Sequence, residues 1–317
     1  MHRIALPVLV LAFSLISLLV GAIPFSVNAL MALDEQTIHL IINSRLPRAL
    51  SILISGMSLA TAGAIMQLLT SNRFVTPSTG STTEWAKLGL LVTIVLLPQA
   101  SPLTKTLVTF AFAFFGTLSF LFILQKIKLK EAAFVPLVGI LYGNIINSAT
   151  TYSAYQKDLI QSVQSWMQGN FGLILRGRYE MLYVSLPLLL LALFYANRFT
   201  IVSMGKDISH VLGVRYISTV QVGLVIVSVI SSLVLVTVGV IPFVGLVVPN
   251  MVSLFKGDNL EKSIFTIALS GGLFLLICDI ISRLVIHPFE IPISVTASIL
   301  GCILFIFFLF YRRNHAS

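Results

Sequence analysis

Charged side chains are scarce in this chain, and three arginines lie where charge is costly. Arg45 and Arg48 flank a proline at the start of a long apolar stretch, and Arg283 lies near the end of another. A guanidinium group stays charged at any working pH, so it enters hydrocarbon only at a high cost in free energy. Asp279 precedes Arg283 by four residues, and this spacing predicts an ion pair within one helix. The residues by themselves favour anchoring of Arg45 and Arg48 to lipid headgroups.

The other residues offer little catalytic chemistry. The five histidines are scattered among helix ends and loops, and we expect neither a metal site nor a cofactor. The phosphate-loop pattern GxxxxGK[ST] is absent, so the chain does not bind ATP in the usual way. A proton-coupled carrier would require an unpaired carboxylate deep in the membrane, whereas the one candidate, Asp279, has Arg283 four residues away. These residues disfavour an enzyme, and a secondary carrier or channel for a small metabolite is the second hypothesis for the function.

Lipid must be the solvent for most of the exterior. The 317 residues are 57% hydrophobic and 10% charged, with a mean hydropathy of +1.01, and so few charges could not cover a water-soluble surface. We interpret the net charge of +9 as the excess of Lys and Arg in the cytoplasmic loops of membrane proteins, not as a sign of a nucleic-acid partner. The apolar run at the N-terminus is longer than that of a signal peptide, which predicts an uncleaved first helix.

Hydropathy predicts an all-α, polytopic membrane protein with about ten transmembrane helices in one domain, residues 1–317. The expected spans are 4–23, 48–69, 84–98, 105–125, 132–155, 180–197, 217–238, 242–255, 263–286 and 292–311. With an even number of spans and basic inner loops, both termini are predicted to be cytoplasmic. Arg45 and Arg48 then face outward, against the general bias of basic residues.

Polar side chains within the spans are candidates for a translocation pathway. Asn144, Asn147, Ser148 and Thr151 are spaced by three and four residues, which places them on one face of a helix, and Gln67 ends the second span. Such residues either line a solvated pathway or form hydrogen bonds between neighbouring helices, and the sequence leaves both interpretations open.

One cytoplasmic segment, about residues 199–217, differs from the other loops. Its distinctive part, "MGKDISHVLGVRYI" at 204–217, predicts a short helix that ends in a glycine turn and presents an apolar surface to a cytoplasmic partner. The residues expected at this contact are Gly205, Asp207, Ile208, Val211, Leu212 and Gly213. A plain connector between two spans is the alternative.

Four separated blocks give the chain a specific resemblance. They read "RLPRALSILISGMSLATAGAIMQ", "MGKDISHVLGV", "VTVGVIPFVGLVVPNMVSLFKGDN" and "CDIISRLV…FEIPISVTASILG". In this order they resemble FecCD-type permeases, the membrane subunits of type II ABC importers for iron-siderophores, haem and cobalamin. The resemblance covers nearly the whole chain and is strongest for the ferric anguibactin and petrobactin branch. Two departures are "NRFVTPSTGSTTEWAKLG" in place of "NPLADP…LG", and Asn250 and Ser253 in place of His and Arg.

The resemblance implies a subunit that moves an iron-siderophore, of a catecholate or mixed, anguibactin-like type, across the bacterial inner membrane. It implies as partners two ATP-binding subunits, a periplasmic or lipid-anchored siderophore-binding protein, and a second permease copy or a sister permease. The family's binding-protein docking arginines fall on Arg45, Arg48 and Arg283, and bidentate pairing with carboxylates suits that role. Its ATPase-coupling loop falls on residues 204–217, so ATP hydrolysis belongs to a separate chain.

Overall fold

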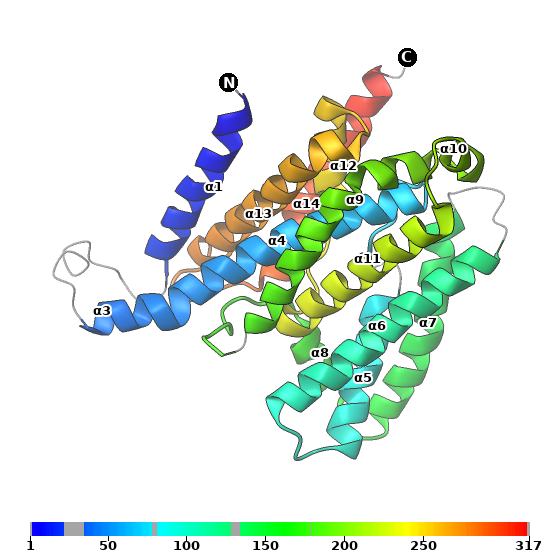
Figure 1. The fold of residues 1–317 in the computed structure, drawn as a ribbon. Helices are drawn as coiled ribbons and strands as arrows, with labels where there is room; N and C mark the ends of the chain where they lie inside the picture. Colours follow the sequence, from blue (N-terminus) through cyan, green and yellow to red (C-terminus); the bar gives the residue numbers. More distant parts are fainter. Residues whose placement is uncertain (1, 22–34, 78–80, 128–133, 178, 316–317) are drawn as a thin grey trace.

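Helices form the whole framework of the computed structural model, which describes residues 2–21, 35–77, 81–127, 134–177 and 179–315 (Figure 1). The long helices are α1 (His2–Leu19), α4 (Leu46–Leu69), α5 (Thr82–Leu96), α6 (Pro102–Lys126), α7 (Phe134–Tyr155), α9 (Ser185–Ser203), α11 (Tyr216–Val238), α12 (Val244–Lys256), α13 (Leu260–Leu284) and α14 (Ile293–His315). The short ones are α3 (Glu35–Leu40), the π-helical turn η1 (Ile41–Arg45), α8 (Ile160–Met167), the 3-10 helix η3 (Glu180–Val184) and α10 (Lys206–Val211). These ranges contain no β-strand, only an isolated bridge between Gln168 and Val240.

Each of the ten predicted spans overlaps one long helix, which confirms the all-α prediction. The expected span ends at 22–23 and 132–133 lie outside the described residues. By length and composition, five helices in the described ranges could cross a membrane: Ile38–Leu69, Leu103–Leu124, Glu180–Ser203, Tyr216–Val238 and Leu260–Leu284. Shorter apolar helices occur at Ala5–Leu19, Val244–Lys256 and Ile293–Phe308. The chain is therefore a multi-pass membrane protein.

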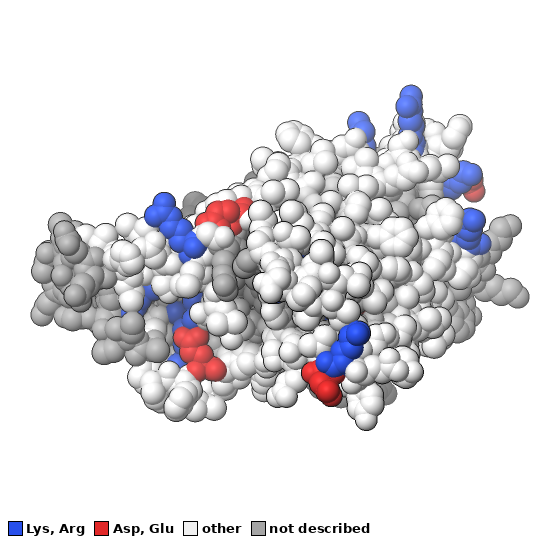
Figure 2. All heavy atoms as spheres, turned by 90° about the horizontal axis from the view of Figure 1, so that it is seen from below, with Lys and Arg blue, Asp and Glu red and all other residues white. Residues whose placement is uncertain are grey.

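The outer surface is suited to lipid. Large apolar side chains such as Phe115, Phe194 and Phe310 point outward and are more than half exposed. Figure 2 shows a face on which Lys, Arg, Asp and Glu form small, separate groups on a broad uncharged surface. In water this exposed apolar area would be unfavourable, whereas in a bilayer it contacts acyl chains.

The two ends of the bundle carry different features. In Figure 1 both chain termini and α10 lie at the upper edge, whereas α3, which leads into Arg45, lies at the lower left. We call these the α10 end and the arginine end. Because α4 runs from the arginine end toward α10 and the later long helices run alternately, residues 70–73 after α4 and the link 204–215 lie at the α10 end, and the link 285–292 lies at the arginine end.

Helix α4 lies at the centre of the bundle. It packs against α9, α11, α12 and α13, while α11 also contacts α5 and α6 and so joins the two halves of the molecule. A Cβ atom added to Gly56 would overlap the backbone of Gly271, and one added to Gly271 would overlap Gly56 and Ala60. Small residues bring helix backbones close together, and such packing stabilises helix association in lipid.

Two non-helical stretches lie side by side within the bundle. The link between α11 and α12 meets the segment after α8, where the Val240 amide donates to the carbonyl of Met167 (2.9 Å) and the Asn170 amide to that of Val238 (3.1 Å). Backbone outside a helix is tolerated in a membrane protein only where it is buried in protein or lines a water-filled cavity. Helix α12, at 13 residues, is correspondingly short.

We predict that Gly271→Ala destabilises the protein more than Gly272→Ala. The added methyl at 271 meets backbone atoms of α4 that cannot move independently, whereas at 272 the nearest atom is the flexible end of the Leu53 side chain, 3.2 Å away. Overpacking of this kind costs about 1–3 kcal/mol. Thermal unfolding of the detergent-solubilised variants measures the difference, and equal midpoints would show that α4 and α13 can separate without cost.

Candidate functional site

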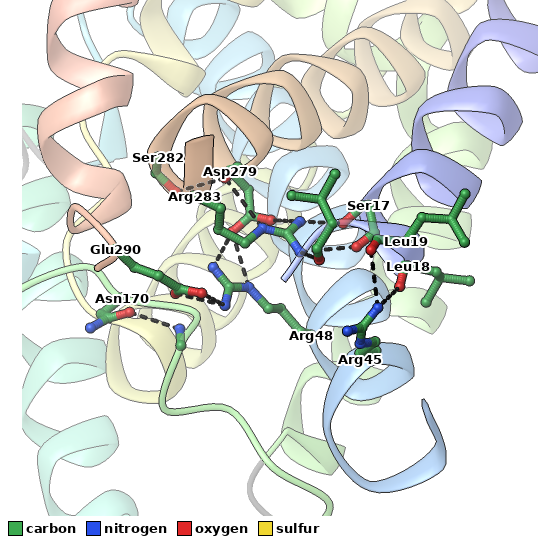
Figure 3. Close-up of polar contacts among 12 residues, drawn as sticks. Ser17, Leu18, Leu19, Arg45, Arg48, Asn170, Asp279, Ser282, Arg283 and Glu290 are labelled. Carbon is green, nitrogen blue, oxygen red and sulfur yellow. Dashed lines mark hydrogen bonds and ion pairs between the residues drawn. The ribbon is translucent and has the colours of Figure 1, made fainter. Parts of the chain in front are cut away.

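Five charged residues gather at the arginine end: Arg45, Arg48, Asp279, Arg283 and Glu290, which we call the arginine cluster (Figure 3). At its centre is the carboxylate of Asp279, which is 0% exposed. Arg48 on α4 donates to Asp279 Oδ1 through Nη2 (2.8 Å) and Nε (3.1 Å), and Arg283 donates to Oδ2 through Nη2. One buried acid therefore pairs with two guanidinium groups, from α4 and from its own helix α13.

Arg48 also reaches the link between α13 and α14. Its Nη1 donates to both carboxylate oxygens of Glu290, at 2.8 and 3.0 Å. The side chains of Arg48 and Glu290 are 14% and 26% exposed, so this pair lies at the edge of the protein. The guanidinium of Arg48 thus ties together α4, α13 and the segment that leads into α14.

The other two arginines close the end of α1. Arg283 Nη1 donates to the carbonyls of Ser17 (2.9 Å) and Val20 (2.5 Å), and its Nη2 donates to Ser17 Oγ (2.6 Å). Arg45 Nη1 donates to the carbonyls of Leu18 (2.6 Å) and Leu19 (3.1 Å). The last carbonyls of a helix have no partner within it and carry partial negative charge, so cations stabilise them there.

These contacts test the predictions made from the sequence for the three arginines and Asp279. The predicted ion pair between Asp279 and Arg283 is confirmed. Anchoring of Arg45 to lipid headgroups is wrong, because that side chain is buried and its Nη1 is bound to carbonyls of α1. Arg48 likewise makes its contacts within the protein. Docking of a binding protein through Arg45, Arg48 and Arg283 stays a prediction.

The predicted short helix in the coupling segment is present as α10. Gly205 precedes it with φ +107° and Gly213 follows it with φ +72°, both in the region that favours glycine. The predicted apolar surface is also present: Ile208, Val211 and Leu212 are all exposed, Val211 by 85%. The segment therefore projects apolar side chains from the α10 end of the molecule, and contact with an ATPase there stays a prediction.

Other bonds hold α10 in place. Ser209 is buried, and its hydroxyl donates to the carbonyl of Gly205 (2.7 Å) and, at 3.3 Å, to that of Ile201 at the end of α9. Asp207, which is exposed, lies in the first turn, where a carboxylate interacts favourably with the helix dipole. The apolar surface is thus presented by a segment fixed to the bundle.

The predicted pathway residues divide into two groups. Asn144, Ser148 and Thr151 lie on an exposed face of α7, and Asn147 accepts a hydrogen bond from Lys87 Nζ at 3.4 Å. Gln67 is buried apart from them, and its amide donates to the carbonyl of Gly245 on α12 (3.1 Å). Gln67 therefore forms a bond between helices, the second of the two interpretations. Whether the α7 residues line a pathway stays open.

Sequence analysis missed Glu290 and Lys87. Glu290 lies in a loop and becomes a partner of Arg48 only through a contact across 242 residues. Lys87 lies inside a span, and a lysine at such a position is itself a signal of function. Among the described residues, no group of three or more His, Cys, Asp or Glu is arranged to hold a metal ion.

We predict that Asp279→Asn is far more destabilising than the same change at Asp258. Asp279 is buried between two arginines, and removing its charge leaves Arg283 without a carboxylate partner and Arg48 with Glu290 alone, which costs about 3–5 kcal/mol. Asp258 pairs with Arg73 at the α10 end (2.5 Å), but its side chain is 63% exposed, so the loss there is at most about 1 kcal/mol. Thermal unfolding of both variants tests this. Similar small losses would mean that the buried pairs contribute little.

Comparison with known proteins agrees with this architecture. A solved structure described as an inward-facing conformation of a metal-chelate type ABC transporter superposes with a TM-score of 0.83. The match covers 97% of this chain and 98% of that one at 24% identity, which shows a shared fold.

Sequence similarity extends over the same length. The chain is 45% identical to the petrobactin import system permease protein YclN of Bacillus subtilis, over 98% of each chain. It is 40% identical to the ferric-anguibactin transport system permease protein FatD of Vibrio anguillarum, over 92% of this chain and 93% of that one. The model of the FecCD transport family matches residues 9–311. The resemblance inferred from the four sequence blocks is confirmed, and the chain belongs to the FecCD transport family.

Proposed function

We propose that this chain is the permease subunit of an ATP-driven importer that carries a ferric siderophore, of a catecholate or mixed type, across the bacterial inner membrane. The observation that carries the proposal is the 45% identity with a petrobactin import permease over 98% of both chains. In this role the chain, as one domain spanning 1–317, provides the membrane passage and has no catalytic activity of its own.

Energy then enters at the α10 end. The importer has two ATP-binding subunits, and one of them docks on α10 of this chain, because exposed Ile208, Val211 and Leu212 form an apolar surface that none of the described residues covers. Basic side chains support a cytoplasmic location for this end and for both termini, since membrane proteins keep such residues inside. The basic residues at the α10 end include Arg73, Lys206, Arg215, Lys256 and Lys262.

Cargo enters at the arginine end. A periplasmic or lipid-anchored siderophore-binding protein docks there, with Arg48 and Glu290 the partly exposed members of the arginine cluster. A second permease copy or a sister permease packs beside this one. Exposed Asn144, Ser148 and Thr151 on α7 then face the pathway between the two, because polar side chains would be unfavourable against lipid.

The geometry gives no support to a secondary carrier. Such a carrier needs a carboxylate that is free to take up and release a proton within the membrane. Asp279 accepts hydrogen bonds from Arg48 and Arg283 on its two oxygens, so it is not an unpartnered carboxylate.

Deletion of the gene tests the proposal. In the bacterium that encodes the chain, the deletion mutant should lose growth on a ferric catecholate siderophore as sole iron source but keep growth on ferrous salts. Complementation with the intact gene should restore it. Unimpaired growth and radioactive iron uptake in the deletion mutant, across catecholate and mixed-type siderophores, would contradict the proposal.

We predict that Val211→Asp uncouples the permease from its ATP-binding partners. The side chain is 85% exposed, so the fold is unaffected, but a carboxylate would be desolvated in an apolar interface. Copurification of the ATP-binding subunits should fall at least about tenfold. Leu173→Asp, at an apolar position that is 66% exposed and lies at the arginine end, is the matched control and should copurify normally. Normal copurification with Val211→Asp would place the coupling contact elsewhere.

A further inference from the structure

A polar groove lies between α5, α8 and the non-helical link that joins α11 to α12. Its volume is about 480 Å³. The polar side chains along it are Thr83, Lys87, Gln161, Gln164, Ser165, Gln168 and Ser294. The groove thus combines hydroxyl and amide groups and one cation with the apolar side chains of Met167, Val240 and Pro242.

Lys87 is the residue in the groove that needs an explanation. It lies in the second turn of α5, a predicted span, and is half-buried. Its Nζ contacts Asn147 Oδ1 at 3.4 Å, a long hydrogen bond. None of the four ion pairs among the described residues includes Lys87 or its neighbour Glu84. A lysine within a span is costly unless it faces a partner charge or a water-filled cavity, so this ammonium group is available to an anion in the groove.

The backbone around the groove supports the presence of water. Gly169 and Val240, which line it, belong to the two non-helical stretches that bond to each other within the bundle. Irregular backbone at membrane depth is found where it lines an aqueous cavity, and interrupted helices often mark the substrate sites of transporters. Ser294 at the start of α14 also lines the groove, which places it toward the arginine end.

We propose that this groove binds the anionic oxygen atoms of the ferric chelate on its way through the permease, with Lys87 as the cation that attracts them. The inference rests on the proposed function and adds a site to it. Oxygen ligands such as catecholates bind iron in their deprotonated form, so a ferric catecholate presents negative charge to the protein. The lysine ammonium is a strongly hydrated charge on a flexible stem, and the glutamine amides offer additional donors. Such a site attracts the cargo without fixing it in one geometry.

Substitutions at Lys87 test the site in cells that carry the complete importer. The probe is a ferric catecholate chelate labelled with radioactive iron. Lys87→Met should lower the initial uptake rate about tenfold, since a hydrogen bond to a charged group is lost. Lys87→Arg should keep most of the uptake, and Lys87→Glu should lower it further than Lys87→Met because like charges repel. Lys157→Met, an exposed lysine at the end of α7, is the control and should leave uptake unchanged.

Two further measurements distinguish cargo binding by Lys87 from a structural role of Lys87. They also distinguish failure of this site from failure of the proposed function. Thermal stability and copurification of the ATP-binding subunits should be the same in wild type and in all Lys87 variants. If the wild type takes up the chelate and Lys87→Met does so at the same rate, the site is overturned and the proposed function stays intact. An unstable Lys87→Met that Lys87→Arg does not rescue would make Lys87 structural and would also overturn it. Absence of uptake by the wild type would overturn the proposed function itself.

Discussion

The buried carboxylate of Asp279 organises one end of this molecule. It accepts hydrogen bonds from Arg48 and Arg283, and each of these arginines uses its other donors on a different element. Arg48 continues to Glu290 beside α14, and Arg283 continues to the last carbonyls of α1. Since an unpaired guanidinium is costly in a low-dielectric interior, buried Arg283 depends on this acid as its carboxylate partner, whereas Arg48 shares the acid with Glu290. The first helix, the central α4 and the start of α14 are thereby fastened to α13.

The two ends of the bundle differ in a way that suits a transport subunit. At the arginine end, Asp279 and Glu290 pair with Arg48 and Arg283, and Arg45 and Arg283 donate to the last carbonyls of α1. At the α10 end, apolar side chains project from a short helix that is fixed to the bundle through Ser209. Between the ends, α4 packs closely on α13 through Gly56 and Gly271, so the bundle can transmit a displacement from one end to the other as a packed unit. The polar groove with Lys87 lies between α5, α8 and the link from α11 to α12.

Much of this fold follows from the sequence because the bilayer thickness sets the length of an apolar run. The ten long helices, α10 with its flanking glycines, and the pair formed by Asp279 and Arg283 were all predictable from local patterns. The capping of α1 by Arg45 and Arg283 was not, because the acceptors are backbone carbonyls, which leave no trace in residue type. The bond from Gln67 to Gly245 and the lining of the groove depend on which non-helical stretches meet, and hydropathy does not encode that.

Reconstitution tests the central claim, that ATP-driven import passes through this chain, most directly. The purified chain would be placed in proteoliposomes together with its ATP-binding subunits. The siderophore-binding protein and the labelled ferric chelate would be added on the side of the bilayer opposite to the ATP-binding subunits. The account predicts accumulation of iron in the direction away from the binding protein, only when ATP is hydrolysed and only when all partners are present. Accumulation by the chain alone, driven by an imposed proton gradient, would contradict it.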